Sequence, residues 1–281
     1  MMKIPFTKMH GLGNNYIYLD LFKTEYEEDM FPVIARKASD VYTGIGSDGL
    51  ILIHPSETGA VGMRIFNKDG SEGWNCGNGL RCVARYAYER GLVDNVKFQI
   101  EAKSGLVHAE VLIDDGVVSI NMGEPRLERA LIPMIGPAKD HVIAEPFSVA
   151  DVELELTAVS MGNPHALFFV DNIKEALITE LGPSIENDTR FPDRVNAGFV
   201  EVLSPTEMNY RVWERGSGIT EACGTGACAA VVAAILNGHM QKETDIHVHL
   251  SGGDLLIKWD GQGNVWMTGE AEIIADGILY I

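Results

Sequence analysis

Cysteine is scarce in this chain, with 4 residues among 281. So few thiols, together with the absence of an apolar signal core in the opening MMKIPFTKMHG, predict a cytoplasmic protein with reduced cysteines. The cysteine spacings are C-x5-C and C-x4-C, no C-x-x-C occurs and the histidines are scattered, so we expect no metal site. Long apolar runs are lacking as well: the longest, 227–236, is about half of what a bilayer requires. We therefore expect no membrane partner.

Positive charge is also in short supply. The chain has 22 Lys and Arg against 40 Asp and Glu, which gives a net charge of −18. Such a balance argues against nucleic acid as a partner, because phosphate backbones attract basic patches. Apolar residues make up 46%, enough for packed cores, and the length allows one large domain or two of ordinary size.

The most informative feature of the sequence is an internal repeat. RIFNKDGSEGWNCGNGLRCVARYA, which starts at Arg64, aligns without a gap with RVWERGSGITEACGTGACAAVVAA, which starts at Arg211. Cys76 then aligns with Cys223, and each is followed by Gly-x-Gly at the start of a helix rich in small residues. A second pair, HGLGNN and SMGNPH, lies earlier in each half. The repeat predicts two similar domains in tandem.

The hydrophobic pattern predicts an α+β fold with many strands and few helices. We expect two pseudo-symmetric domains, each a strongly curved, mostly antiparallel sheet around one central helix, with the active site in the cleft between them. The central helices are predicted over 78–89 and 225–237, and neither follows a βαβ phosphate fingerprint. The expected domains are 1–125, to which the strand 271–281 returns, and 126–270.

Cys76 and Cys223 are the candidate catalytic residues. A helix N-terminus favours the thiolate, and the glycines after each cysteine let a ligand approach the backbone. A two-fold arrangement would make the two thiols face one another. The remaining cysteines, Cys82 and Cys228, break the repeat, because their counterparts are Ala229 and Arg81, and we assign them to core packing.

Two opposed thiols suit the inversion of an α-carbon. That reaction requires a base on one face and an acid on the other, and the two exchange roles in the reverse direction. The backbone N–H groups of Gly77, Asn78, Gly224 and Thr225 would hold the substrate α-carboxylate and stabilise the charge that develops. Because no pyridoxal-phosphate lysine signature accompanies these loops, we expect no cofactor, the helix dipoles serving in place of an electron sink.

At these residues the sequence resembles the diaminopimelate epimerase family. The motifs that carry the resemblance occur in order over nearly the whole chain: MHGLGN at 9–14, GIGSDG at 44–49, NKDGSE at 67–72, CGNG at 76–79, SMGNPH at 160–165, FPDRVNAGF at 191–199, ERGSG at 214–218 and CGTGAC at 223–228. The resemblance implies interconversion of LL- and meso-diaminopimelate without a cofactor, two lobes with a cleft between them, and a homodimer.

The resemblance also implies a set of substrate-binding residues. His165 and Glu214 match family residues close to the thiols and are expected to tune them. One position departs from the pattern, since Gly49 stands where some members carry a glutamine that contacts substrate. The residues matching the family's substrate contacts are Asn14, Asn67, Asn78, Asn163, Asn196, Glu214, Arg215, Gly224 and Thr225.

Two other functions remain open from the sequence. One is a different two-cysteine racemase of the same architecture, acting on proline, hydroxyproline or histidine. A monocarboxylate would leave the forked guanidinium of Arg215 without a partner. The other is an amino-acid binding protein without catalysis, in which the thiols are incidental. Exchange of the α-hydrogen with solvent separates them, because a binding protein does not catalyse it.

Overall fold

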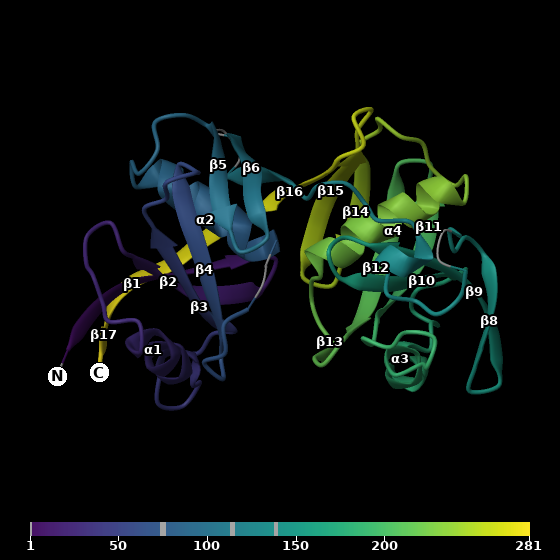
Figure 1. Ribbon diagram of the computed structural model, residues 1–281, viewed down its shortest axis with the longest axis horizontal. Coiled ribbons are helices and arrows are strands. Elements are labelled where there is room, and N and C mark those ends of the chain that lie inside the picture. The colour runs from purple at the N-terminus through teal and green to yellow at the C-terminus, as the bar shows by residue number, and fades with distance from the viewer. Residues whose placement is uncertain (1, 74–76, 113–115, 138–139) are drawn as a thin grey trace. The chain divides into compact units, whose positions relative to one another are not determined.

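A computed structural model describes residues 2–73, 77–112, 116–137 and 140–281. Cys76 lies outside the described residues. The chain divides into two compact units, the first comprising Met1–Asn121 and Thr268–Ile281 and the second Met122–Met267. Strands and helices occur in both units (Figure 1). Strands dominate both units, which confirms the predicted α+β class.

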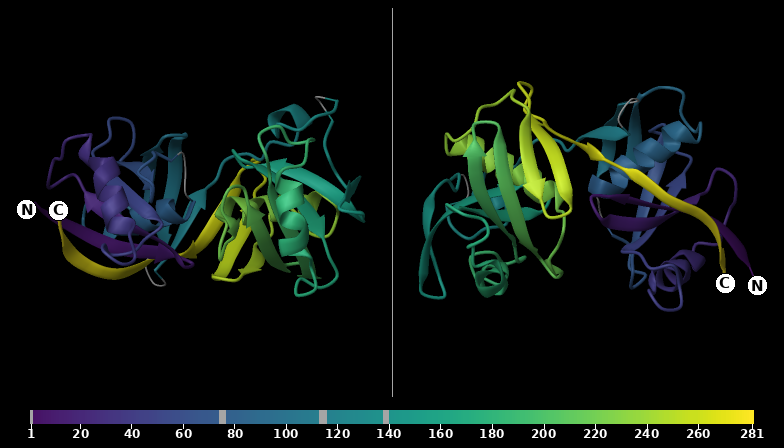
Figure 2. Two further views of the ribbon diagram at one scale, coloured as in Figure 1. Left: turned by 90° about the horizontal axis from the view of Figure 1, so that it is seen from below. Right: turned by 180° about the vertical axis from the view of Figure 1, so that it is seen from behind.

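The first unit combines antiparallel and parallel strand pairs. β1 and β2 are antiparallel, β2 and β3 parallel, β3 and β4 antiparallel, β4 and β5 parallel, and β5, β6 and β7 antiparallel in succession. The C-terminal strand β17 runs antiparallel to β1 along its length (Figure 2). The elements are β1 (Lys3–Gly11), β2 (Asn14–Asp20), α1 (Met30–Ser39), β3 (Gly49–His54), β4 (Val61–Asn67), α2 (Gly77–Glu89), β5 (Lys97–Ala102), β6 (Gly105–Leu112), β7 (Val117–Asn121) and β17 (Glu272–Tyr280).

The second unit repeats this order of pairings. β9 and β10 are antiparallel, β10 and β11 parallel, β11 and β12 antiparallel, β12 and β14 parallel, and β14 and β15 antiparallel. Its elements are the 3-10 turn η1 (Arg129–Leu131), β8 (Glu145–Val149), β9 (Val152–Ser160), β10 (Pro164–Phe169), α3 (Ile178–Glu186), β11 (Asn196–Ser204), β12 (Glu207–Glu214), β13 (Gly218–Ile219), α4 (Gly224–Leu236), β14 (Ile246–Leu250), β15 (Gly253–Trp259) and β16 (Val265–Glu270), whose end passes into the first unit.

The two predicted central helices are present as α2 and α4. Each begins at a residue directly after its cysteine in the sequence, one residue earlier than predicted. In α4 nearly every side chain is buried, and small residues let the strands come close. Gly226 shows the constraint, because a Cβ there would lie 2.2 Å from the hydroxyl oxygen of Tyr210 on β12. Any larger residue would push the helix off the sheet.

Two further helices, α1 and α3, accompany the central helices. Both contain proline, Pro32 and Pro183, and α3 also has Gly182, all residues with low helix propensity. Each helix nevertheless buries one face: α1 buries Phe31 and Ile34 among other residues. Burial of that apolar face outweighs the local propensity.

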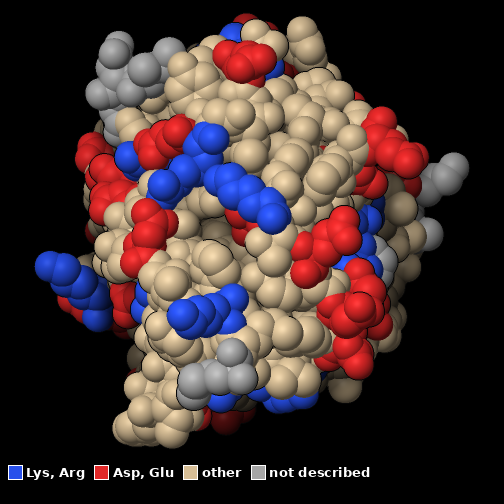
Figure 3. Space-filling view, turned by 90° about the vertical axis from the view of Figure 1, so that its left-hand side faces the viewer, with Lys and Arg blue, Asp and Glu red and all other residues tan. Residues whose placement is uncertain are grey.

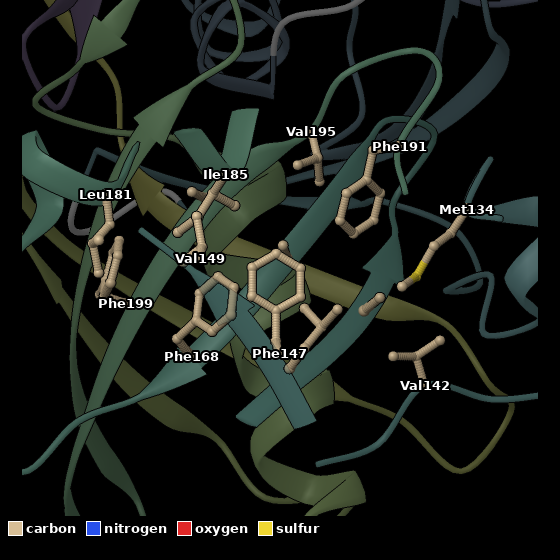
Figure 4. Packing of buried hydrophobic residues seen from close by; sticks show 14 of the residues in the cluster. Met134, Val142, Phe147, Val149, Phe168, Leu181, Ile185, Phe191, Val195 and Phe199 are labelled. Atoms are coloured by element: carbon tan, nitrogen blue, oxygen red, sulfur yellow. The ribbon is translucent and has the colours of Figure 1, made fainter. Parts of the chain in front are cut away.

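The core of the second unit contains a cluster of aromatic and aliphatic side chains (Figure 4). The rings of Phe147 and Phe168 have centroids 5.3 Å apart, and those of Phe168 and Phe199 are 5.7 Å apart. Leu181 and Ile185 of α3 point into the same cluster (Figure 4). Each such buried side chain contributes about 1.5–3 kcal/mol, so α3 is firmly anchored on the sheet.

Charges of both signs are interspersed on the face shown in Figure 3. Oppositely charged side chains form ion pairs, as Arg64 does with Glu28 at 2.9 Å and Arg90 with Asp276 at 2.7 Å. Within the described part of the chain, no helix has the length and apolarity needed to cross a bilayer.

Candidate active site

Of the two candidate catalytic cysteines, the structure describes Cys223. It precedes α4 as the N-cap in extended conformation, and its carbonyl accepts a hydrogen bond of 2.9 Å from the N–H of Ala227. The thiol lies 3.6 Å from the Thr225 hydroxyl, and the residue is 6% exposed. The thiol therefore sits where the first unpaired N–H groups of the helix can stabilise a negative charge.

The surroundings of Cys223 keep its thiol protonated at rest. Burial raises the pKa of Cys223 well above its ordinary value, and the Glu214 carboxylate adds to the rise. The Thr225 hydroxyl and the Gly226 N–H act in the opposite direction on this pKa. Burial also raises the pKa of Glu214, while hydrogen bonds from Thr220 and Cys223 lower it. A thiol with a raised pKa gives up its proton only to a strong base.

A polar chain runs from Thr225 to His165. The amide of Asn163 donates to the Thr225 hydroxyl at 3.2 Å, and the Oδ1 atom of Asn163 lies 3.2 Å from Nε2 of His165. His165 is fully buried, and that burial, helped by the charge of Arg215, lowers the pKa of the imidazole to about 3. His165 is therefore a neutral partner of Asn163, and it orients the amide toward the turn that holds Cys223.

Asn196 and Arg215 form the other part of this half of the site. Asn196, at the start of β11, accepts a hydrogen bond of 2.8 Å from the backbone N–H of Arg215 and donates one of 3.1 Å to the carbonyl of Pro164. The guanidinium of Arg215 donates to the carbonyl of Asp193 at 2.7 Å. The amide of Asn196 thus connects the strand that carries His165 with the turn that carries Arg215.

In the first unit, Asn14 and Asn78 are in contact. The amide of Asn78 donates to Asn14 at 3.3 Å, and the amide of Asn14 donates to Asp48 at 2.9 Å. Arg81, fully buried in α2, donates to the Asn78 side chain at 2.9 Å and to the Glu270 carbonyl at 3.2 Å. These contacts fix the side chain of Asn78, the middle residue of the Gly-x-Gly turn that begins α2.

The remaining predicted residues lie close to these groups in sequence. Asn67 is the last residue of β4, and Glu214 is the last residue of β12. The side-chain amide of Asn67 donates to the Ser71 hydroxyl at 3.0 Å. Gly77 and Gly224 are the first residues of α2 and α4. Cys76 belongs to the undescribed part of the chain. Side-chain contacts bring Asn14 together with Asn78, and Asn163 together with His165, Thr225 and Cys223.

Sequence reasoning missed several residues that support the site. Asp48 and Arg81 hold the asparagines of the first unit, and Glu186 accepts hydrogen bonds around the turn of Arg215. The available signal for Arg81 was a charged residue between apolar ones in the predicted helix, which also carries Arg85. Glu186 gave no signal, because its partners Trp213 and Gly216 lie far along the chain. No group of three or more metal-binding side chains occurs among the described residues.

The fold is shared with known racemases and related proteins. A probable proline racemase from Agrobacterium radiobacter matches with a TM-score of 0.71 at 13% identity, covering 99% of this chain and 93% of that one. A PhzF-family phenazine biosynthesis protein from Bacillus anthracis matches with a TM-score of 0.72 at 17% identity, covering both chains fully. The chain therefore has the fold of the racemase and epimerase class.

Sequence comparison defines the family within this class. The family model described as diaminopimelate epimerase matches residues 6–128 and 157–274. The diaminopimelate epimerase of Oceanobacillus iheyensis is 61% identical over 99% of both chains, and that of Bacillus subtilis is 55% identical over the full length of both. The chain belongs to the diaminopimelate epimerase family.

Proposed function

We propose that this protein epimerises LL-2,6-diaminopimelate to the meso form without a cofactor, using Cys76 and Cys223 as the two acid–base groups. The observation that carries the proposal is the 61% identity to a protein named diaminopimelate epimerase over 99% of both chains. The surroundings of Cys223 support it, because a buried thiol at a helix N-terminus is suited to giving and taking one proton.

The proton transfer follows from the chemistry of inversion. One thiolate removes the α-hydrogen as a proton, leaving the electron pair on the α-carbon, and the opposite thiol supplies a proton on the other face. Cys223 begins as the thiol, since burial and Glu214 raise its pKa. Arg81 places a positive charge in α2, the helix that follows Cys76. At the matching position of α4 the repeat has the neutral Cys228. We therefore assign the resting thiolate to Cys76.

The rest of the substrate is bound by polar groups around the thiols. Backbone N–H groups of Gly77, Asn78, Gly224 and Thr225 hold the α-carboxylate and stabilise the charge developing on it. Arg215, with its forked guanidinium, binds the distal carboxylate. Asparagine amides can both donate to a carboxylate and accept from an ammonium group. The asparagines assigned to substrate are Asn14, Asn67, Asn78, Asn163 and Asn196.

We further propose that the protein acts as a homodimer in the cytoplasm and binds no nucleic acid. The outer face of β17 supports a dimer, because Ile274, Ile278 and Tyr280 are 50%, 51% and 48% exposed. Ile278 and Tyr280 are two residues apart and so lie on one face of the strand, and Asp276 separates them from Ile274. Sedimentation equilibrium of the wild type and of Ile278→Glu tests this part, and a wild-type monomer would contradict it.

The proposed reaction is tested by incubating the protein with LL-diaminopimelate in deuterated water. We expect the meso isomer to appear with deuterium at the inverted α-carbon. A racemase for proline, hydroxyproline or histidine would instead exchange the α-hydrogen of one of those amino acids and leave diaminopimelate unchanged. A binding protein would exchange none of them, and either result would contradict the proposal.

A further inference from the structure

Glu186 is a buried carboxylate that accepts hydrogen bonds from three groups on two other segments of the chain. The residue ends α3 and is 6% exposed. Its Oε2 atom accepts from the indole N–H of Trp213 at 2.8 Å. Its Oε1 atom accepts from the backbone N–H of Gly216 at 2.9 Å and from the guanidinium of Arg194 at 3.0 Å. Burying such a charge is costly unless the partners stay in place, so their geometry is strongly fixed.

The partners of Glu186 adjoin the residues assigned to substrate. Gly216 directly follows Arg215, and the Glu186 carbonyl accepts from the N–H of Val195 at 3.2 Å, directly before Asn196. Asn196 in turn accepts the Arg215 N–H at 2.8 Å. Through these bonds one residue joins the turn of Arg215 to the segment that leads into β11.

The helix that carries Glu186 is itself well held. Leu181 and Ile185 are buried in the core cluster (Figure 4). On another side of α3, a Cβ at Gly182 would lie 2.6 Å from the Trp213 ring, so this ring rests directly on the helix. The carboxylate therefore has a rigid base, which is what a group that positions others requires.

The described residues of the first unit do not form this arrangement. Ser39 ends α1 at the place corresponding to Glu186, and its carbonyl accepts from Ser47 at 3.3 Å as that of Glu186 does from Val195. The Ser39 hydroxyl lies 3.1 Å from that of Ser47, and Phe66 occupies the position of Trp213 without an indole N–H. The repeated fold thus forms without the carboxylate. Inversion requires an equivalent acid–base group from each unit. The distal end of a two-headed substrate, by contrast, has to be bound at only one place.

We propose that Glu186 is a positioning residue that fixes Arg215 and Asn196 for binding the distal end of a two-headed amino acid, and so contributes to substrate specificity. This inference rests on the proposed function.

The test compares steady-state constants of the wild type and Glu186→Gln with LL-diaminopimelate. If the amide nitrogen of the introduced glutamine takes the place of Oε2, two donors, this amide and the Trp213 N–H, face one another. We expect the turn of Arg215 to shift as a result. We expect KM to rise about tenfold or more while kcat changes less than about threefold, as for a lost buried hydrogen bond. Exchange of the α-hydrogen of lysine, which lacks the distal carboxylate, should change far less. An unchanged KM overturns the inference, as does an equal loss with lysine.

Two further variants guard against a general loss of folding. Trp213→Phe removes the indole donor and installs the residue found in the first unit; alone it should raise KM, and it should shrink the effect of Glu186→Gln. Glu201→Gln is the matched control, because Glu201, like Glu186, accepts hydrogen bonds from a side chain and from a backbone N–H. The donors are the side-chain amide of Asn209 at 2.7 Å and the N–H of Ile173 at 3.3 Å. We expect it to leave KM unchanged.

Independent effects of the Glu186 and Trp213 substitutions, or an equal rise of KM in the Glu201 control, contradict the positioning role. Should Glu186→Gln fail to fold, Trp213→Phe decides alone, and an unchanged KM in that variant overturns the inference. A wild type without epimerase activity overturns the proposed function instead, so the two failures are distinguishable.

Discussion

The thiol of Cys223 and the hydroxyl of Thr225 lie 3.6 Å apart in the first turn of α4. That contact lowers the pKa of the thiol, whereas burial and the Glu214 carboxylate raise it. The same side chain of Thr225 accepts the amide of Asn163 at 3.2 Å. Thr225 therefore links the acid–base chemistry of the thiol to the orientation of the asparagine beside it.

Substitutions of these neighbours should move the pKa of Cys223 in opposite directions. Glu214→Gln removes the negative charge, so the thiol should ionise at lower pH, and Thr225→Val removes the hydroxyl, so it should ionise at higher pH. The measurement is the pH dependence of alkylation at Cys223 by iodoacetamide, read by peptide mass spectrometry. Shifts in the same direction for both variants would contradict this account of the site.

Acid should destabilise the protein through His165. Its folded-state pKa is about 3 against an ordinary value of 6.5, so between these values the unfolded chain binds a proton that the folded chain does not. Stability from this group is complete above pH 6.5 and is lost as pH falls toward 3. Lowering the pH from 6.5 to 5 should cost about 1.5 kcal/mol. Urea unfolding at both pH values should show a smaller loss for His165→Gln; an equal loss would disprove the assignment.

Arg215→Lys should impair turnover although it keeps the positive charge. Lysine cannot donate the two parallel hydrogen bonds of a guanidinium to a carboxylate, so kcat/KM for diaminopimelate should fall about 10- to 100-fold. Initial rates over a range of substrate concentrations provide the measurement. A wild type that acts equally well on proline would show instead that no distal carboxylate is recognised.

Two buried tyrosines should respond oppositely to loss of the hydroxyl. The Tyr210 hydroxyl has no hydrogen-bond partner among the described residues, so Tyr210→Phe should raise the free energy of unfolding by about 1 kcal/mol. Tyr86 donates to Asp20 at 3.2 Å, so Tyr86→Phe should lower it by about 1 kcal/mol. Urea titration measures both, and a destabilised Tyr210→Phe would reveal a partner for that hydroxyl.

The sequence predicted the α+β class and both central helices because its signals there are local and repeated. Small residues after Cys76 and Cys223 mark α2 and α4 directly. The helix α3 could not be predicted in the same way, since Gly182 and Pro183 weaken its propensity and only packing on the sheet compensates.

The contacts that support the site residues could not be predicted from the sequence, because they join residues far apart in the chain. Glu186 meets Trp213 and Gly216 only after the strands between them have paired. Likewise, Asn163 meets Thr225 across 62 residues of chain. Resemblance to a family indicates which residues bind substrate, but the groups that hold them come from tertiary structure.

The requirement for both cysteines tests the central claim most directly. The rate of inversion of LL-diaminopimelate should be measured for Cys76→Ala and Cys223→Ala, with Cys82→Ala and Cys228→Ala as controls. Loss of either acid–base group should reduce inversion by about 10²–10⁴-fold, whereas the controls should keep most of the activity. Inversion by Cys76→Ala or Cys223→Ala at close to the wild-type rate would contradict the two-cysteine mechanism.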